Sequence, residues 1–201
     1  MPAATANRVR IIGGRFRGRV IRFPAVAGLR PTPDRVRETL FNWLGQDLSG
    51  QKTLDLYAGS GALTLEALSR GAELAVAVDR NVELVRALAE TASAIGATGL
   101  STHAADARAH LARDTGLYDV IFLDPPFAMD EWHWLLPACV ARLAGAGYVY
   151  AEAGHELKAS GGLNVWRHAK AGAVHYHLLV RANDAASDGA ASDGTSDNCL
   201  P

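Results

Sequence analysis

The stretch Asp55-Leu56-Tyr57-Ala58-Gly59-Ser60-Gly61 joins a predicted strand to a predicted helix, and it decides the fold. Apolar residues at 53–57 indicate a buried strand, and residues 61–70 have the pattern of a helix. Glycines in such a turn let the backbone approach a ligand closely, and the amino end of a helix favours polar or anionic groups. The two glycines match the first two of a dinucleotide-binding fingerprint, although Thr64 stands at the third position. Alone, the stretch predicts either a ligand-binding loop or a tight turn.

An acidic residue, Asp79, follows the next apolar strand at 74–78 and lies 20 residues after Gly59. A carboxylate at this place can accept hydrogen bonds from both hydroxyls of a ribose. A helix cap is the alternative role for Asp79, but Asn81 fills that role better. The loop and the carboxylate together indicate a cofactor that contains adenosine.

Strands and helices alternate along the rest of the chain. Further strands are expected at 100–105, 118–123, 147–151, 163–167 and 173–180, and further helices at 34–44, 81–95 and 132–143. Val82, Val85, Ala89 and Ala92 are expected to face inward from the helix at 81–95. This alternation predicts an α/β fold with a doubly wound, mostly parallel sheet.

The tetrapeptide Asp124-Pro125-Pro126-Phe127 follows the strand at 118–123, at the edge of the sheet where ligands bind. Two prolines fix the backbone, so that the Asp124 carboxylate and a free carbonyl point in one direction. Phe127 offers a flat surface on which a base can stack. Two acceptors suit an exocyclic amine, whose lone pair becomes nucleophilic when its N–H bonds are drawn out of the ring plane. A carboxylate then stabilises the developing positive charge. We favour this interpretation over a rigid turn with a core phenylalanine.

The basic residues are concentrated near the amino terminus. Of 20 basic and 21 acidic residues in the chain, nine arginines but only Asp34 and Glu38 lie before Leu44. Residues 8–23 alternate polar and apolar side chains around glycines, which indicates a β-hairpin with arginines spaced to follow phosphates. A basic arm on an acidic body points to a polyanionic partner, although a solvated basic face is the alternative.

Several other functions are disfavoured by what the sequence lacks. There is no apolar run of about 20 residues and no signal-peptide pattern, so we expect no membrane association. Cys139 and Cys199 lie far apart and have no ligands at metal-binding spacing, which favours a cytoplasmic location. His175 and His177 share one face of a strand, but without a third ligand, and we expect no metal.

The chain resembles the RsmD family, bacterial methyltransferases of guanine N2 in 16S ribosomal RNA. The resemblance runs from about Arg8 to Arg181. It rests on the glycine stretch, the Asp-Pro-Pro-Phe tetrapeptide and three blocks, namely Arg10-Ile11-Ile12-Gly13-Gly14 with Arg17-Gly18-Arg19, Leu29-Arg30-Pro31-Thr32, and the helix at 34–44. It implies the Rossmann-like class I fold of methyltransferases that use S-adenosylmethionine, with seven strands and an antiparallel last strand. The implied target is N2 of guanine 966.

What the resemblance implies for single residues follows the matching positions. Asp79 would bind the ribose, Asp106 would approach the adenine amine, and Thr32 and Arg35 would close the site. The cofactor-binding positions are Thr32, Arg35, Asp55, Tyr57, Gly59, Gly61, Asp79 and Asp106. The catalytic positions are Asp124, Pro125, Pro126 and Phe127, and the RNA-binding ones are Arg10, Arg15, Arg17 and Arg19.

We therefore expect three regions: a basic, RNA-binding hairpin and helix at 1–50, a catalytic domain at 51–182, and a disordered tail at 183–201. The expected partner is 16S rRNA, within an assembling small ribosomal subunit, and the expected state is a monomer. One alternative is an amino-methyltransferase acting on adenine N6, because the tetrapeptide does not exclude that substrate. A nicotinamide-dependent oxidoreductase and a non-catalytic RNA-binding protein fit the motifs less well.

Overall fold

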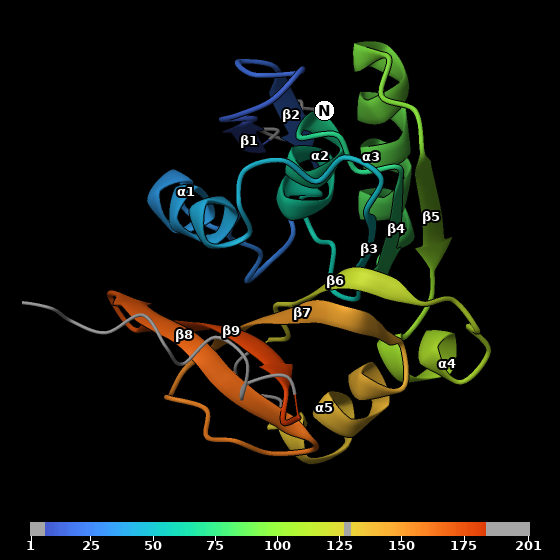
Figure 1. The fold of residues 1–201 in the computed structure, drawn as a ribbon. Helices are drawn as coiled ribbons and strands as arrows, with labels where there is room; N and C mark the ends of the chain where they lie inside the picture. The colour runs from blue at the N-terminus through green and yellow to red at the C-terminus, as the bar shows by residue number, and fades with distance from the viewer. Residues whose placement is uncertain (1–6, 127–129, 184–201) are drawn as a thin grey trace, which may run out of the picture.

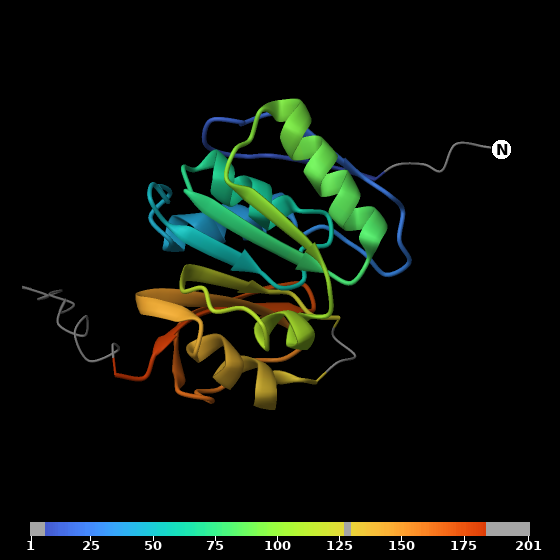
Figure 2. The same ribbon diagram turned by 90° about the vertical axis from the view of Figure 1, so that its right-hand side faces the viewer.

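The computed structural model describes residues 7–126 and 130–183. Its centre is a seven-stranded sheet in the order β5-β4-β3-β6-β7-β9-β8, with helices on both faces (Figures 1 and 2). The strands are β3 (Lys52–Asp55), β4 (Leu74–Asp79), β5 (Leu100–Ala104), β6 (Tyr118–Leu123), β7 (Leu143–Ala153), β8 (Leu163–Ala171) and β9 (Val174–Arg181). The helices are α1 (Asp34–Trp43), α2 (Ala62–Ser69), α3 (Val82–Ile95), α4 (Ala107–Leu111) and α5 (Trp132–Val140).

The topology confirms the predicted class of fold. Strands β3 to β7 pair in parallel, and β9 inserts antiparallel between β7 and β8. The order of the strands reverses at β3, because β4 lies on one side of it and β6 on the other. In a doubly wound sheet, ligands bind beyond the carboxyl ends of the strands at this switch point. Both predicted motifs, the glycine stretch after β3 and the tetrapeptide after β6, begin there.

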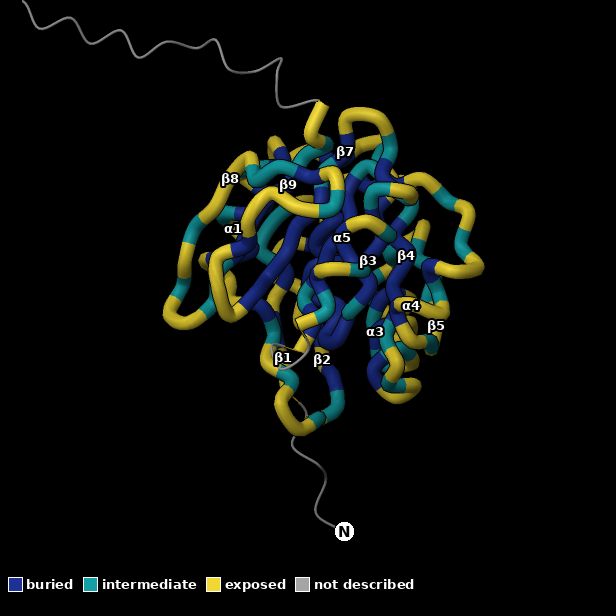
Figure 3. Tube along the Cα trace, turned by 90° about the horizontal axis from the view of Figure 1, so that it is seen from below, coloured by how far each residue is buried: buried dark blue, intermediate teal, exposed yellow. Residues whose placement is uncertain are grey.

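Each face of the sheet has its own hydrophobic core. Helices α1, α2 and α3 cover one face, where Leu40, Leu65 and Phe122 are fully buried. Helices α4 and α5 cover the other, where Leu135 and Ile121 are fully buried. Figure 3 shows central strands such as β3 and β4 as largely dark blue segments inside a rim of exposed loops. Burial on both faces explains why the central strands are almost continuously apolar.

The buried face of α3 differs from the expected one. Leu84, Leu88 and Ala92 are the buried residues, so the prediction is confirmed for Ala92. It is wrong for Val82, which is 64% exposed, and for Ala89, which is also exposed. Asn81 caps the helix as predicted, accepting hydrogen bonds from the N–H groups of residues 83 and 84. Val82 is therefore the first helical residue, and its side chain is exposed to solvent. Because leucine offers more apolar area than alanine, the face with Leu84 and Leu88 gains more by burial.

The amino-terminal segment packs on the outside of α2. Strands β1 (Asn7–Arg10) and β2 (Val20–Phe23) form the predicted antiparallel hairpin, but residues 11–19 between them are a loop and not part of a ribbon. This loop lies against the end of α2, where Arg15 N–H donates to the Ser69 carbonyl over 2.6 Å. A Cβ on Gly14 would come within 1.9 Å of that carbonyl oxygen, so only glycine fits.

A buried ion cluster joins the hairpin, α1 and α2. Glu66 is fully buried, and its carboxylate accepts from the N–H groups of Ile12 and Gly13, from Arg37 and from Arg70. Arg37 is itself fully buried and also donates to the Arg10 carbonyl. One of the nine arginines of the basic arm is thus an internal structural cation.

No helix among the described residues has the length and apolar character needed to cross a membrane. Phe127 and the tail at 184–201 lie outside the described residues.

Candidate functional site

A cavity of about 380 Å³ opens at the carboxyl ends of β3, β4 and β6. Its volume falls in the range of small-molecule and cofactor sites. The predicted residues that line it are Thr32, Asp55, Tyr57, Gly59, Asp79, Asp106, Asp124 and Pro126. Pro125, Arg35 and Gly61 are described but do not line it. The structure thus gathers most of the predicted site from five separate stretches of sequence.

Asp79 holds the glycine loop in place. One carboxylate oxygen accepts the Gly59 N–H over 2.8 Å, and the other accepts the Asn81 N–H over 2.8 Å. Gly59 has φ +50°, and a Cβ there would lie 2.9 Å from Leu29 Cδ1. The backbone is therefore kept bare beside the cavity, and the remaining lone pairs of Asp79 stay open to hydroxyl donors. This arrangement fits the ribose of an adenosine.

Asp55 lies buried at the end of β3. Its carboxyl accepts a hydrogen bond from the Thr64 hydroxyl over 2.7 Å. Thr64, which stands where the dinucleotide-binding fingerprint has its third glycine, therefore holds the Asp55 side chain in place. Burial raises the pKa of Asp55 to about 7, although the Thr64 hydrogen bond opposes this effect. A carboxyl poised near neutrality responds strongly to a cationic ligand beside it.

Asp106 serves both as a helix cap and as a cavity residue. Its carboxylate accepts the N–H groups of Arg108 and Ala109 at the start of α4. Beside it, the Arg108 guanidinium lies 4.3 Å from the ring centroid of Trp134, which also lines the cavity. The indole nitrogen of Trp134 is buried and has no hydrogen-bond partner among the described residues. A planar, apolar wall with an open polar donor suits a heterocyclic base.

Asp124 follows β6 and faces the cavity as predicted. Burial raises its pKa well above the ordinary value, and the negative charges of Glu152 and Asp55 add to this effect. Pro126 lines the cavity next to it, whereas Pro125 is buried. The site therefore concentrates negative charge where a cation would be bound or formed.

No motif in the sequence pointed to Glu152, which lies buried on β7. Its carboxylate accepts from the Thr32 hydroxyl over 3.0 Å and from the Tyr150 hydroxyl over 2.8 Å. Thr32 consequently does not cap α1, since Pro33 occupies the cap position of this helix without a side-chain hydrogen bond. The Thr32–Glu152 bond instead fastens the segment before α1 over the cavity. Arg30 of this segment lines the cavity in place of Arg35, which lies exposed on α1.

The sheet, the bare glycine loop and the acidic residues at the carboxyl edge define an S-adenosylmethionine-dependent methyltransferase. The family model described as "Conserved hypothetical protein 95" matches residues 9–180. The chain belongs to this family, the RsmD family of ribosomal RNA small-subunit methyltransferases.

Known relatives agree over most of the chain. "Ribosomal RNA small subunit methyltransferase D" of Escherichia coli is 36% identical, over 91% of this chain and 95% of its own length. "Putative rRNA methyltransferase YlbH" of Bacillus subtilis is also 36% identical, over 75% of this chain and 85% of its own. Among solved structures, "Putative methyltransferase yhhF" from Escherichia coli has a TM-score of 0.78 at 36% identity, over 87% of this chain and 98% of that one.

Replacing Asp79 by Ala is expected to weaken cofactor binding about 10- to 100-fold, because hydrogen bonds to a charged acceptor are lost. Calorimetry with S-adenosylmethionine and with S-adenosylhomocysteine is expected to show similar losses, since both carry the ribose. Asp79→Asn keeps one acceptor and is expected to lose less. Glu83→Ala, at an exposed position of α3, is the control. An Asp79→Ala variant with wild-type affinity would remove this residue from the site.

The affinity for S-adenosylmethionine is expected to rise with pH and to level off above pH about 7. Its sulfonium cation favours ionised Asp55, so binding below the pKa of about 7 releases a proton. The affinity can then grow at most about tenfold per pH unit. S-adenosylhomocysteine lacks the cation and is expected to show a weaker dependence. The raised pKa of Asp55 has the opposite effect on the stability of the unliganded protein. Because ionised Asp55 is disfavoured in the folded state, the free energy of unfolding falls as the pH rises from about 4 to 7. Identical calorimetric pH profiles for both ligands would contradict this coupling.

Proposed function

We propose that this enzyme transfers a methyl group from S-adenosylmethionine to N2 of a guanine in 16S rRNA, at the position equivalent to guanine 966. The observation that carries the proposal is the position of Asp124, at the end of β6 beside the glycine loop and facing the same cavity. Family membership supports the choice of rRNA, and the resemblance of the amino-terminal blocks supports the guanine.

The bound cofactor supplies an electrophilic methyl group on a sulfonium. The remaining work falls to the side chains of the enzyme. Asp124 accepts an N–H of the target amine, which draws the nitrogen lone pair out of conjugation with the ring. The charge of Asp124 then stabilises the positive charge that develops on nitrogen. Its raised pKa also makes it a suitable acceptor for the proton that the amine gives up.

We assign residues 1–50 to an RNA-binding extension and residues 51–182 to the catalytic domain. Arg10, Arg15, Arg17 and Arg19 are exposed, the last three in the loop that joins β1 and β2. Buried Arg37 is excluded from this surface. A target base must leave its stack to enter the cavity. The enzyme therefore has to bind the phosphates on either side of that nucleotide while the base is out of the stack. Exposed guanidinium groups on a loop anchored to α2 suit that task.

Changing Arg15, Arg17 and Arg19 together to Gln is expected to weaken RNA binding and to flatten its salt dependence. The slope of log affinity against log salt is expected to fall by about 0.7–0.9 per lost phosphate contact, up to about 2–3 units. Filter binding over a salt series measures it. Arg86 and Arg113, exposed on the catalytic part, provide the control when changed to Gln. An unchanged slope in the triple variant would mean that the loop is a structural flap and not an RNA surface.

The proposal is tested with purified enzyme, tritiated S-adenosylmethionine and two substrates, naked 16S rRNA and isolated small subunits. We expect labelled N2-methylguanosine after digestion to nucleosides. Label in N6-methyladenosine would favour the alternative amino-methyltransferase and contradict the guanine assignment. The ratio of label between the two substrates shows whether the enzyme prefers rRNA within a subunit, as expected for an assembling particle, or naked rRNA.

A further inference from the structure

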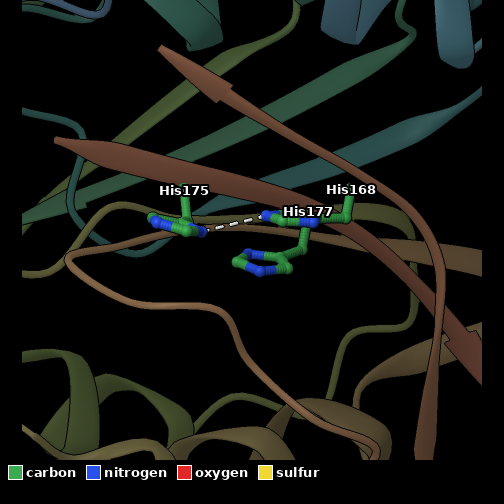
Figure 4. Close-up of side chains that lie close together, drawn as sticks. All are labelled: His168, His175 and His177. Atoms are coloured by element: carbon green, nitrogen blue, oxygen red, sulfur yellow. Dashed lines mark hydrogen bonds between the residues drawn. The ribbon is translucent and has the colours of Figure 1, made fainter. Parts of the chain in front are cut away.

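Three histidines gather on one face of the β8–β9 hairpin. His175 and His177 alternate along β9, so both side chains point to the same side of the sheet. His168 on β8 lies directly opposite His177 in the antiparallel register. Each of the three rings contributes one nitrogen, and these three nitrogens all lie within 4.8 Å of one another (Figure 4). His168 thus supplies the third imidazole. The sequence did not indicate it, because its position opposite His177 depends on how β8 and β9 pair.

The spacing of the nitrogens approaches that of a metal site. His168 Nε2 and His175 Nδ1 face each other at 3.0 Å (Figure 4). Two nitrogens at about 2.0–2.1 Å from a tetrahedral zinc ion are separated by about 3.3 Å. This pair therefore needs to open by only a few tenths of an ångström to accept an ion. His177 has to approach by a larger amount.

The outer nitrogen of His177 already has a partner of the kind that metal-binding imidazoles use, and a carboxylate lies near that of His168. His177 Nδ1 lies 3.2 Å from the Ala151 carbonyl oxygen, which fixes its proton there and leaves the Nε2 lone pair as acceptor. His168 Nδ1 lies 4.0 Å from a Glu156 carboxylate oxygen. Carbonyl and carboxylate acceptors behind the imidazole orient metal ligands in this way. At present His177 Nε2 accepts the Leu157 N–H over 3.0 Å, and an ion would replace that hydrogen bond.

The charge state also favours a cation. Burial lowers the pKa of His177 to about 4, and burial with the nearby charges of Lys170 and His168 lowers that of His175. Both imidazoles are therefore neutral at pH 7 and need not lose a proton to bind a metal. The His168 side chain is 27% exposed, which gives an ion access from solvent.

We propose that His168 Nε2, His175 Nδ1 and His177 Nε2 bind a divalent transition-metal ion, with zinc as the best match, and that water fills a fourth position. Three imidazoles with an open position are a known donor set for zinc. The site lies beside the segment between β7 and β8, which carries Glu156 and Leu157. It faces the α5 side of the sheet, whereas Glu152 and the Thr32 contact lie on the other side.

The test uses the full chain without a histidine tag, freed of metal by chelation and then titrated with Co²⁺ and Zn²⁺. We expect one equivalent of Co²⁺ to give the intense visible absorption of a four-coordinate ion, and one equivalent of Zn²⁺ to remove it. His168→Ala and His175→Ala are expected to lower the Zn²⁺ affinity at least about 100-fold each. They alter partly exposed positions, so circular dichroism can verify that the fold is kept.

The matched control removes the other adjacent pair of imidazoles, His103 and His110, whose ring centroids lie 4.9 Å apart near the β5 edge. The control double variant is expected to bind Zn²⁺ as the unmodified chain does. Either of two results would overturn the proposal. One is the absence of stoichiometric, four-coordinate Co²⁺ binding, and the other is an affinity that falls in the control but not in the His168 and His175 variants.

Discussion

Replacing Asp124 by Ala is expected to slow methyl transfer in a single turnover about 100- to 1000-fold. The cofactor affinity is expected to change far less, because Asp124 acts on the amine as its positive charge develops. The structure supports so large an effect. Asp124 faces the cavity, burial raises its pKa, and Glu152 and Asp55 add negative charge beside it. Rapid-quench measurement with saturating RNA separates the chemical step from binding.

The Asn variant of Asp124 separates charge from hydrogen bonding. Asp124→Asn keeps an acceptor for the amine N–H but carries no charge, so an intermediate rate is expected. Asp130→Asn, at an exposed position six residues further on, is the control for a change of net charge. If both Asp124 variants keep the wild-type single-turnover rate, the electrostatic mechanism proposed here is wrong.

Replacing Glu66 by Ala is expected to lower the free energy of unfolding by about 3–5 kcal/mol, because it leaves buried cations unpaired. For a chain of this length, the melting temperature is expected to fall by about 6–20 °C. Glu66 is fully buried, and it bridges Arg37, Arg70 and two backbone N–H groups of the amino-terminal segment. Denaturant unfolding followed by circular dichroism measures the loss. Because the same carboxylate anchors the hairpin, limited proteolysis is expected to cut this variant first within residues 11–19.

Glu90 offers a matched control for Glu66. It also pairs with an arginine four residues away on a helix, over 3.2 Å to Arg86, but both side chains are at least 70% exposed. Glu90→Ala is expected to cost no more than about 0.5 kcal/mol. Similar losses in the two variants would contradict the structural role given to the buried cluster.

The sequence predicted the parts of the site that are local in the chain. The glycine loop, Asp79 and the tetrapeptide each follow a strand directly, and parallel strands bring their carboxyl ends to one edge. That geometry explains why Asp79 and Asp124 line one cavity, whereas the resemblance to a family was needed to predict Thr32 and Asp106. The face of α3 was misjudged because Val82 and Leu84 are equally plausible in a helical pattern. Only the packing against the sheet decides between them.

The residues that were missed act through partners far away in sequence. Glu152 meets Thr32 across 120 residues, and Glu66 meets Arg37 across 29. Arg37 was counted with the basic arm, since its sequence context is the same as that of the exposed arginines. His168 was overlooked because its place opposite His177 depends on strand register. Periodicity and motif spacing carry no information about such pairs.

We propose that this enzyme methylates N2 of one guanine in small-subunit rRNA. The most direct test is mass mapping of 16S rRNA from cells that lack the protein, beside the same cells complemented with the wild type or with Asp124→Ala. We predict that one N2-methylguanosine disappears in the deletion, returns with the wild type and stays absent with Asp124→Ala. An unchanged N2-methylguanosine pattern in the deletion strain, or the loss of a methyl group from adenine instead, would contradict the claim.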